Sequence, residues 1–339
     1  EQQREISLDE AGTAWYDKVY LPVAQMIQHR GILRDFPNRT VTDLYIWISQ
    51  YRTEVEQELG WKIRPEAAAT EVVHEYSPTP EHVIARVGEK LYDVLTPDEL
   101  ASGPAPGAWQ REALADRRED HLFPDILVPV SGEERGWCAL DQAIEVARGE
   151  EGYVHGLHIV SSDHLKHSTA AFAVNAEFDQ RCQTAGITGN LAIEVGDIPR
   201  KICERARWTD LVVIPLVNPP GRGPFARLES PFRTIVLRSP RPILAVPTMA
   251  TKMDRALLAY DGSPKAHEAL FLSTYLAGHR PSSLVVMCVE DERVTSETLA
   301  FAREYLYRHG VKATFIHKTG PVGETILETA EDYERNLII

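Results

Sequence analysis

The sequence predicts an α/β protein with two tandem, doubly wound parallel-sheet domains, preceded by an all-α segment. The first observation is a repeat: Asp125–Gly132, DILVPVSG, recurs 130 residues later as Arg255–Gly262, RALLAYDG. Each copy is a short apolar run that ends in a polar residue plus glycine and precedes a helical pattern, which is how a βαβ unit opens. The second observation is that further strand and helix patterns follow both copies in the same order, as in a duplicated domain.

The first copy begins a domain at residues 123–249. Near-continuous apolar runs predict strands at 125–130, 153–160, 190–195, 210–215 and 242–247. Helical patterns between them predict helices near 135–149, 168–185, 198–207 and 230–238. Strands that alternate with helices form parallel sheets, which bind ligands at the carboxyl ends of their strands.

The second copy begins a domain at residues 250–339 that lacks the last helix and strand of the first. Strands are predicted at 255–260, 282–289, 313–317 and 336–339, and helices at 264–278, 294–309 and 322–333. Because the chain begins without methionine and stops inside a strand pattern, we expect it to be a piece of a longer protein.

Residues 1–97 are predicted to form a helical module. Thr40 or Thr42 caps a helix that Gly60 ends in the C′ position. Prolines mark the other helix boundaries, by a kink or by opening a first turn: Pro22, Pro65 and Pro80. Residues 98–122 combine proline, glycine and a dense run of charges, which predicts a linker with one short helix near Trp109.

The composition excludes several classes of function. The chain has 339 residues, 43% of them hydrophobic and 25% charged, as in an ordinary globular protein. A net charge of −14 argues against nonspecific binding to nucleic acid. No apolar run is long enough to span a membrane, and the first residues show no secretory signal. Four cysteines without a CxxC pair favour the reducing cytoplasm.

These patterns resemble the universal stress protein family over residues 123–339. The first repeat matches it with ILVPV-S-G, ALDQAIEVA, LHIV, DLVVI and SPRPILAVP, and the second with ALLAYDGS, EALFLSTYLA, VVMCVED and TGPVGETILETA. The resemblance implies the adenine-nucleotide alpha-hydrolase-like fold. Residues 31–48 are similar to a helical module sometimes found beside such domains, which implies no defined chemistry.

The resemblance implies a nucleotide site in the second repeat. In nucleotide-binding members an aspartate ends the first strand and contacts the nucleoside, and a residue at the end of the second strand packs on adenine. Asp261, with Gly262 and Ser263, matches the first position, and Cys288 or Val289 matches the second. The glycine-rich phosphate loop of the family would begin just after Ile339. An Asp-Gly pair is equally typical of a simple turn.

The first repeat departs from the nucleotide-binding pattern. Ser131 replaces the aspartate, and Ser230 occupies the hydroxyl position of the phosphate loop behind Glu229, where the family has glycine. A carboxylate there would repel phosphate, and the prolines of this loop have no N–H to donate. The run Gly221, Arg222 and Gly223 is a candidate anion loop, although such runs are more often flexible surface loops.

The sequence contains no catalytic motif, and His164 with His167 offers too few ligands for a metal site. We therefore expect a cytoplasmic stress-response protein that binds ATP, or a related adenine nucleotide, in the second domain for regulation; slow hydrolysis is the weakest hypothesis. The alternative is a docking scaffold that binds no nucleotide and serves the N-terminal module or an outside partner. The apolar edge strand at 242–247 predicts pairing between the two domains or a homodimer through sheet edges.

Overall fold

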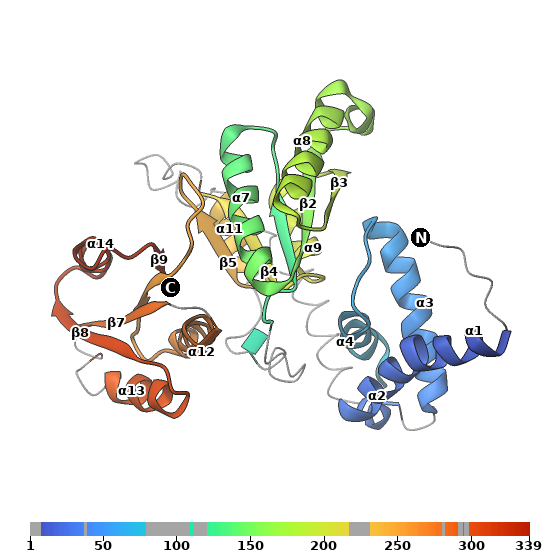
Figure 1. The fold of residues 1–339 in the computed structure, drawn as a ribbon, viewed down its shortest axis with the longest axis horizontal. Coiled ribbons are helices and arrows are strands. Elements are labelled where there is room, and N and C mark those ends of the chain that lie inside the picture. Colours follow the sequence, from blue (N-terminus) through green and yellow to red (C-terminus); the bar gives the residue numbers. More distant parts are fainter. Residues whose placement is uncertain are drawn as a thin grey trace. The chain divides into compact units, whose positions relative to one another are not determined.

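The computed structural model describes residues 8–36, 39–78, 109–110, 121–216, 231–279, 282–290, 294 and 298–339. The chain separates into two compact units, residues 1–102 and residues 103–339. The first unit is helical, and the second contains two all-parallel sheets with helices between the strands (Figure 1). No helix in these ranges is long and apolar enough to cross a membrane.

The helical unit begins with a chain of consecutive helical segments. They are α1 (Leu8–Trp15), the π-helical turn η1 (Tyr16–Tyr20), α2 (Leu21–His29), the short 3-10 helix η2 (Ile32–Arg34), α3 (Val41–Leu59) and α4 (Pro65–Tyr76). Pro22 lies in the first turn of α2, where a missing N–H costs nothing. The predicted boundary at Pro22 is therefore confirmed, and the structure adds a π-helical turn before it.

Helix α3 has the ends that the sequence predicts. Thr40 is the N-cap, and its hydroxyl accepts a hydrogen bond from the Asp43 N–H at 3.2 Å. The Asp43 carboxylate in turn accepts the Thr40 N–H at 2.9 Å, which completes a capping box. Gly60 ends the helix with a φ of 76°. Of the two proposed caps, Thr40 is confirmed; the helix predicted to open at Pro80 lies outside the described residues.

The first sheet has five parallel strands in the order β3-β2-β1-β4-β5. Its strands are β1 (Asp125–Pro129), β2 (Tyr153–Val160), β3 (Gly189–Val195), β4 (Leu211–Pro215) and β5 (Ile243–Val246). Its helices are α7 (Glu134–Glu150), α8 (Thr169–Ala185), α9 (Ile198–Ala206) and α11 (Pro231–Arg238), with a short 3-10 helix, η3 (Asp163–His167), before α8. The pair α7 and α8 pack together, as do α9 and α11.

The second sheet repeats the first without its last strand. It has the order β8-β7-β6-β9, formed by β6 (Arg255–Ala259), β7 (Ser283–Glu290), β8 (Ala313–Thr319) and β9 (Leu337–Ile338). The helices are α12 (Pro264–His279), α13 (Thr298–Arg308) and α14 (Val322–Asp332). Asp125 pairs with Tyr153 across β1 and β2, and Arg255 pairs with Ser283 across β6 and β7, so the two registers agree. The predicted fold class is confirmed.

The two sheets belong to one unit because they share apolar and polar contacts. Met253 and Tyr275 of the second repeat lie in the same buried cluster as Ile126 and Phe178 of the first. The Tyr275 hydroxyl donates to the buried Glu150 carboxylate at 2.8 Å. These contacts place the end of α7 directly against α12.

Candidate functional site

The carboxyl end of β6 is a tight turn built by three residues that the sequence singles out. The Asp261 carboxylate accepts the backbone N–H of Ser263 at 2.9 Å, and the Ser263 hydroxyl accepts the N–H of Ala266 in the first turn of α12 at 3.2 Å. Gly262 has a φ of 75°, and a Cβ there would lie 3.0 Å from the Thr298 methyl. Glycine is therefore required between the carboxylate and the helix cap.

The turn after β1 has the same geometry without the charge. The Ser131 hydroxyl accepts the Glu133 N–H at 3.3 Å, two residues ahead, just as Asp261 accepts from Ser263. Gly132 has a φ of 86°, and a Cβ there would lie 2.8 Å from a methyl of Val174. Both turns expose their polar side chain at the carboxyl edge of a sheet, but only the second offers a carboxylate to a ligand.

Cys288 and Val289 occupy opposite faces at the end of β7. Cys288 is fully buried in the cluster beneath α12 and α13, whereas Val289 is half-buried and packs against the cluster under α14. Successive strand residues alternate between faces, so only one of the two can meet a ligand at the edge. Val289 is the one with exposed surface.

The same edge contains a polar pair that the sequence reading missed. Glu290 ends β7, and its carboxylate lies 3.9 Å from Nε2 of His317 on β8. Both side chains are partly exposed. The two residues come together only through the register of β7 with β8, in which Glu290 lies opposite Thr319. In the sequence, the available signal was that Glu290 directly follows the apolar strand predicted at 282–289.

Tyr260 lies buried directly before Asp261, in the cluster formed with α12 and α13. Burial, and then the neighbouring Asp261 carboxylate, raise the pKa of Tyr260 to about 12. The hydroxyl therefore stays protonated at neutral pH. Among the described residues it has no hydrogen-bond partner.

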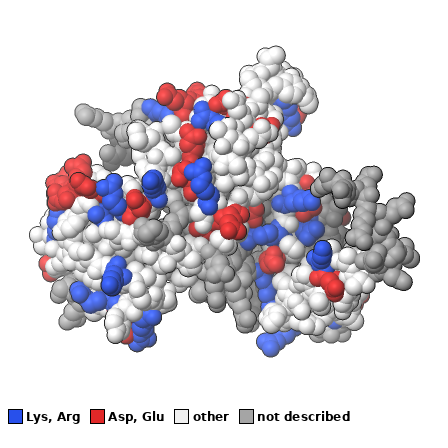
Figure 2. All heavy atoms as spheres, in the orientation of Figure 1, with Lys and Arg blue, Asp and Glu red and all other residues white. Residues whose placement is uncertain are grey.

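The candidate anion loop of the first repeat cannot be placed beside these residues. Gly221, Arg222, Gly223 and Ser230 all lie outside the described residues. The charge distribution gives no substitute on the face drawn in Figure 2, where described acidic and basic side chains are interspersed.

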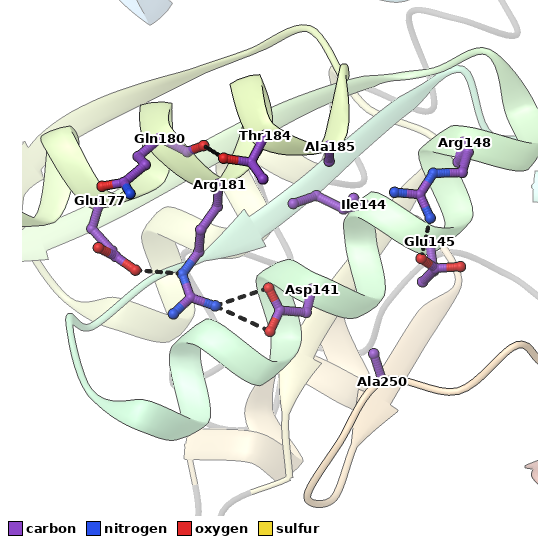
Figure 3. A pocket seen from close by; sticks show the side chains of 10 residues that line it. All are labelled: Asp141, Ile144, Glu145, Arg148, Glu177, Gln180, Arg181, Thr184, Ala185 and Ala250. Carbon is purple, nitrogen blue, oxygen red and sulfur yellow. Dashed lines mark hydrogen bonds and ion pairs between the residues drawn. The ribbon is translucent and has the colours of Figure 1, made fainter.

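A polar groove of about 480 Å³ lies between α7 and α8 (Figure 3). Arg181 projects from α8 into it, donating to Glu177 at 2.6 Å and to both oxygens of Asp141 at 3.0 and 3.1 Å. Arg148 pairs with Glu145 on the α7 side. Since both arginines are neutralised by carboxylates inside the groove, it has no free positive charge to attract a phosphate.

A second hollow, of about 340 Å³, is lined by apolar side chains of both repeats. Leu211 and Leu244 contribute from β4 and β5, and Leu272 and Leu337 from α12 and β9. It borders β5, which is one of the two edge strands of the first sheet. Apolar surface beside an unpaired strand edge is suited to contact with another strand or hydrophobic segment.

The cysteines and metal-binding side chains form no reactive centre in the described ranges. Burial raises the pKa of the Cys182 and Cys203 thiols to about 11, so neither is a thiolate at neutral pH. None of the four cysteines forms a disulfide. No group of three or more His, Cys, Asp or Glu side chains in the described part is arranged to hold a metal ion.

Comparison with solved structures identifies the fold. A universal stress protein from Archaeoglobus fulgidus DSM 4304 is 19% identical and covers 64% of this chain and 85% of its own, with a TM-score of 0.56. A putative universal stress protein from Pseudomonas aeruginosa UCBPP-PA14 is 18% identical, with 64% and 81% covered and a TM-score of 0.48. A universal stress protein in complex with cAMP is 21% identical, with 38% and 98% covered and a TM-score of 0.33.

No family profile matches the sequence, and no curated protein matches it. The overlap with the Archaeoglobus protein shows that this chain has the universal stress protein fold. The internal geometry is consistent with this conclusion, because the two sheets repeat the same strand order.

Proposed function

We propose that this protein is a stress-response protein that binds an adenine nucleotide at the carboxyl edge of its second sheet. The observation that supports the proposal is the exposed Asp261 carboxylate in the turn between β6 and α12. Ligands of open parallel sheets bind at this edge, where strands end and helices begin. A carboxylate accepts hydrogen bonds only, which suits the paired hydroxyls of a ribose.

Two further features favour a nucleoside here. Only one Asp261 oxygen is used by the Ser263 N–H, so the other remains for a ribose hydroxyl. Val289 offers an apolar surface at the end of the adjacent strand, on which a base would pack. The first repeat has Ser131 in place of Asp261 and would bind a nucleotide weakly or not at all.

ATP is the nucleotide we propose, bound for regulation rather than for turnover. We place this function in the cytoplasm, because four cysteines without a CxxC pair suit a reducing compartment. Asp261 serves as a ligand for the nucleoside and not as a base that activates water. In this proposal, bound nucleotide changes the surface at the start of α12, and a partner protein would recognise that surface.

The test uses three variants of the second repeat, which are Asp261→Ala, Asp261→Asn and the control Glu328→Ala. Glu328 is an exposed carboxylate on α14, outside the turn. Nucleotide released from gently purified protein is identified by mass, and adenosine and ATP are then titrated by calorimetry. Adenosine isolates the nucleoside end from the phosphates.

Asp261→Asn keeps the acceptor that holds Ser263 and removes the charge, so it separates a ligand role from a turn role. We expect both Asp261 variants to bind adenosine at least about tenfold more weakly, the loss typical of a hydrogen bond to a charged group. Glu328→Ala should bind as the unsubstituted chain does. An Asp261→Asn protein with unchanged affinity would reduce Asp261 to a turn residue. Absence of released nucleotide, together with no melting shift in millimolar ATP, would overturn the proposal.

The second candidate function is a docking scaffold, and the apolar hollow beside β5 favours it. In this alternative the two repeats pair with one another, or two chains pair through their sheet edges, and the apolar hollow receives a partner segment. Native mass spectrometry separates monomer from dimer. A charged substitution at the hollow, Leu244→Lys, should break a dimer of this kind, whereas Asp261→Asn should leave it intact.

A further inference from the structure

The helical unit exposes a continuous group of aromatic rings, which we call the aromatic platform and define as Trp15, Tyr16, Tyr20 and Tyr45. Trp15 stacks on Tyr20 with ring centroids 5.8 Å apart, and Tyr16 stacks on Tyr20 at 5.5 Å. Tyr45 of α3 meets Tyr20 edge-on at 4.9 Å. Despite these contacts, Trp15 is 48% exposed and Tyr16 is 49% exposed.

The π-helical turn η1 assembles the platform. In an α-helix only residues three or four apart lie together on one face, so Trp15 and Tyr20 would point in different directions. The wider turn of η1 brings residues five apart close together, and single π-helical turns occur frequently at functional sites. The Tyr20 hydroxyl is tied to Thr42 of α3 at 3.0 Å, which fixes the platform to a second helix.

An exposed surface of this kind is not needed for the core. The unit already buries apolar side chains between α2, α3 and α4, among them Ile27, Leu44, Ile48 and Val72. Val19 and Ile46, on the same two segments η1 and α3, are also exposed apolar side chains. Contiguous exposed apolar patches on single chains mark interaction sites, and tryptophan and tyrosine dominate the binding energy of interfaces.

Charge indicates what the platform binds. The described residues of this unit, 8–36 and 39–78, include eleven Asp and Glu against seven Lys and Arg. Nearest to the platform along the chain, η1 itself carries Asp17 and Lys18, and Asp43 directly follows Thr42, whose hydroxyl bonds Tyr20. The electron-rich faces of exposed rings in an acidic field attract cations, and a planar guanidinium can stack on a ring as well as carry charge.

The unit contains one such contact already. The Arg39 guanidinium lies 4.5 Å from the ring centroid of Trp47, on the same helix that supplies Tyr45. We propose that the aromatic platform is a docking surface for an arginine-containing basic segment of a partner protein, whose guanidinium groups stack on Trp15 and Tyr16. This interaction is independent of the nucleotide site and uses a different unit of the chain.

The test measures binding of labelled nona-arginine, nona-lysine and nona-proline peptides to the full chain at physiological salt. The variants are Trp15→Ala and Tyr16→Ala, which change the two most exposed rings of the platform. The matched control is Tyr307→Ala, because Tyr307 is 80% exposed on α13 of the other unit. Thermal melts confirm that each variant is folded. If Trp15→Ala does not fold, the binding measured with Tyr16→Ala decides the test.

We expect nona-arginine to bind more tightly than nona-lysine, because only guanidinium stacks. Each platform substitution should weaken nona-arginine binding about tenfold, within the usual range for a cation on an aromatic face, and Tyr307→Ala should not. Equal binding of the two basic peptides, or an affinity unchanged by Tyr16→Ala, would mean attraction to the acidic chain alone and would overturn the proposal. Tightest binding by nona-proline would assign the surface to a polyproline helix instead.

Discussion

Two buried tyrosines of the second repeat have opposite environments at the residue scale. The Tyr275 hydroxyl lies 2.8 Å from the Glu150 carboxylate and accepts the Leu122 N–H at 2.9 Å. The Tyr260 hydroxyl is buried without a hydrogen-bond partner among the described residues. We predict that Tyr275→Phe lowers the free energy of unfolding by about 1–3 kcal/mol, because it removes a hydrogen bond to the buried Glu150 carboxylate. Tyr260→Phe should leave stability unchanged or raise it.

Urea unfolding of the chain, followed by far-UV circular dichroism, measures both variants on the same transition. The two substitutions remove the same oxygen from the same residue type, so each is the control for the other. Equal losses for the two would show that the Tyr260 hydroxyl is satisfied in solution. The Tyr260 hydroxyl would then no longer count as a buried group without a hydrogen-bond partner.

The candidate site residues divide by the kind of information each required. Asp261, Gly262 and Ser263 were predictable because a turn between strand and helix is local in sequence. The choice between Cys288 and Val289 was not, since it depends on which face of β7 each residue occupies. The Glu290–His317 pair was missed because strand register, and not sequence proximity, brings it together.

The capping box of α3 makes a prediction at the scale of an element. Thr40→Ala removes the acceptor for the Asp43 N–H, so it should lower the free energy of unfolding of the helical unit by about 1 kcal/mol. Thr53→Ala is the control, because the Thr53 hydroxyl bonds only back to Ser49 within the same helix. Amide hydrogen exchange of peptides from α3 measures this unit by itself, whereas tryptophan fluorescence would also report Trp109, Trp137 and Trp208 of the other unit. Identical effects of the two substitutions would contradict the role of the cap.

The capping box also predicts how the stability of the helical unit depends on pH. Hydrogen bonds from the Thr40 N–H and then from its hydroxyl lower the pKa of Asp43 below its ordinary 3.8. A carboxyl with a lowered folded pKa stabilises the fold above its unfolded pKa, and this contribution is lost as the pH falls through the folded value. The difference between the unsubstituted chain and Thr40→Ala should therefore shrink below about pH 4.

Elements were the most predictable level of the fold. Apolar runs of strand length and helical spacing gave every strand of both sheets, because local composition is sufficient for both signals. The π-helical turn η1 was not foreseen, since a proline in the next turn predicts a kink or a break but not how the turn before it adapts. The aromatic platform follows from that unforeseen turn, so it too was invisible to the sequence reading.

At the scale of the whole molecule, pairing of the two repeats could be proposed from the sequence, but the residues that make the contact could not be identified from it. The topology of each sheet follows from its own strand order, and the second reproduces the first. The residues that join them belong to no motif: Glu150 ends α7, and Tyr275 lies 125 positions later in α12. From the sequence alone, Glu150 at the end of a helix would be taken for an ordinary exposed charge, because its hydrogen-bond partners are far away in the chain.

Glu150 is the centre of this contact, because one of its oxygens accepts three hydrogen bonds from two segments far apart in the sequence. The donors are the Leu122 N–H at 2.8 Å, the Phe123 N–H at 3.1 Å and the Tyr275 hydroxyl at 2.8 Å. The first two lie in the segment that enters β1, and the third lies in the second repeat. Glu150→Ala leaves the Phe123 N–H and the Tyr275 O–H without this acceptor, while the Leu122 N–H keeps the Tyr275 oxygen. The substitution should lower the free energy of unfolding by about 3–5 kcal/mol.

The loss should also uncouple the repeats, and hydrogen exchange measured by mass spectrometry distinguishes this from uniform destabilisation. In the unsubstituted chain we expect peptides from β2 and β7 to share one opening free energy, since the contact at Glu150 makes the two sheets a single cooperative unit. In Glu150→Ala the β7 peptide should exchange faster than the β2 peptide. Glu145→Ala, which changes an exposed carboxylate of the same helix, should leave both unchanged. A parallel rise in both Glu150→Ala peptides would mean that the apolar contacts of Met253 and Tyr275 hold the repeats together without the carboxylate.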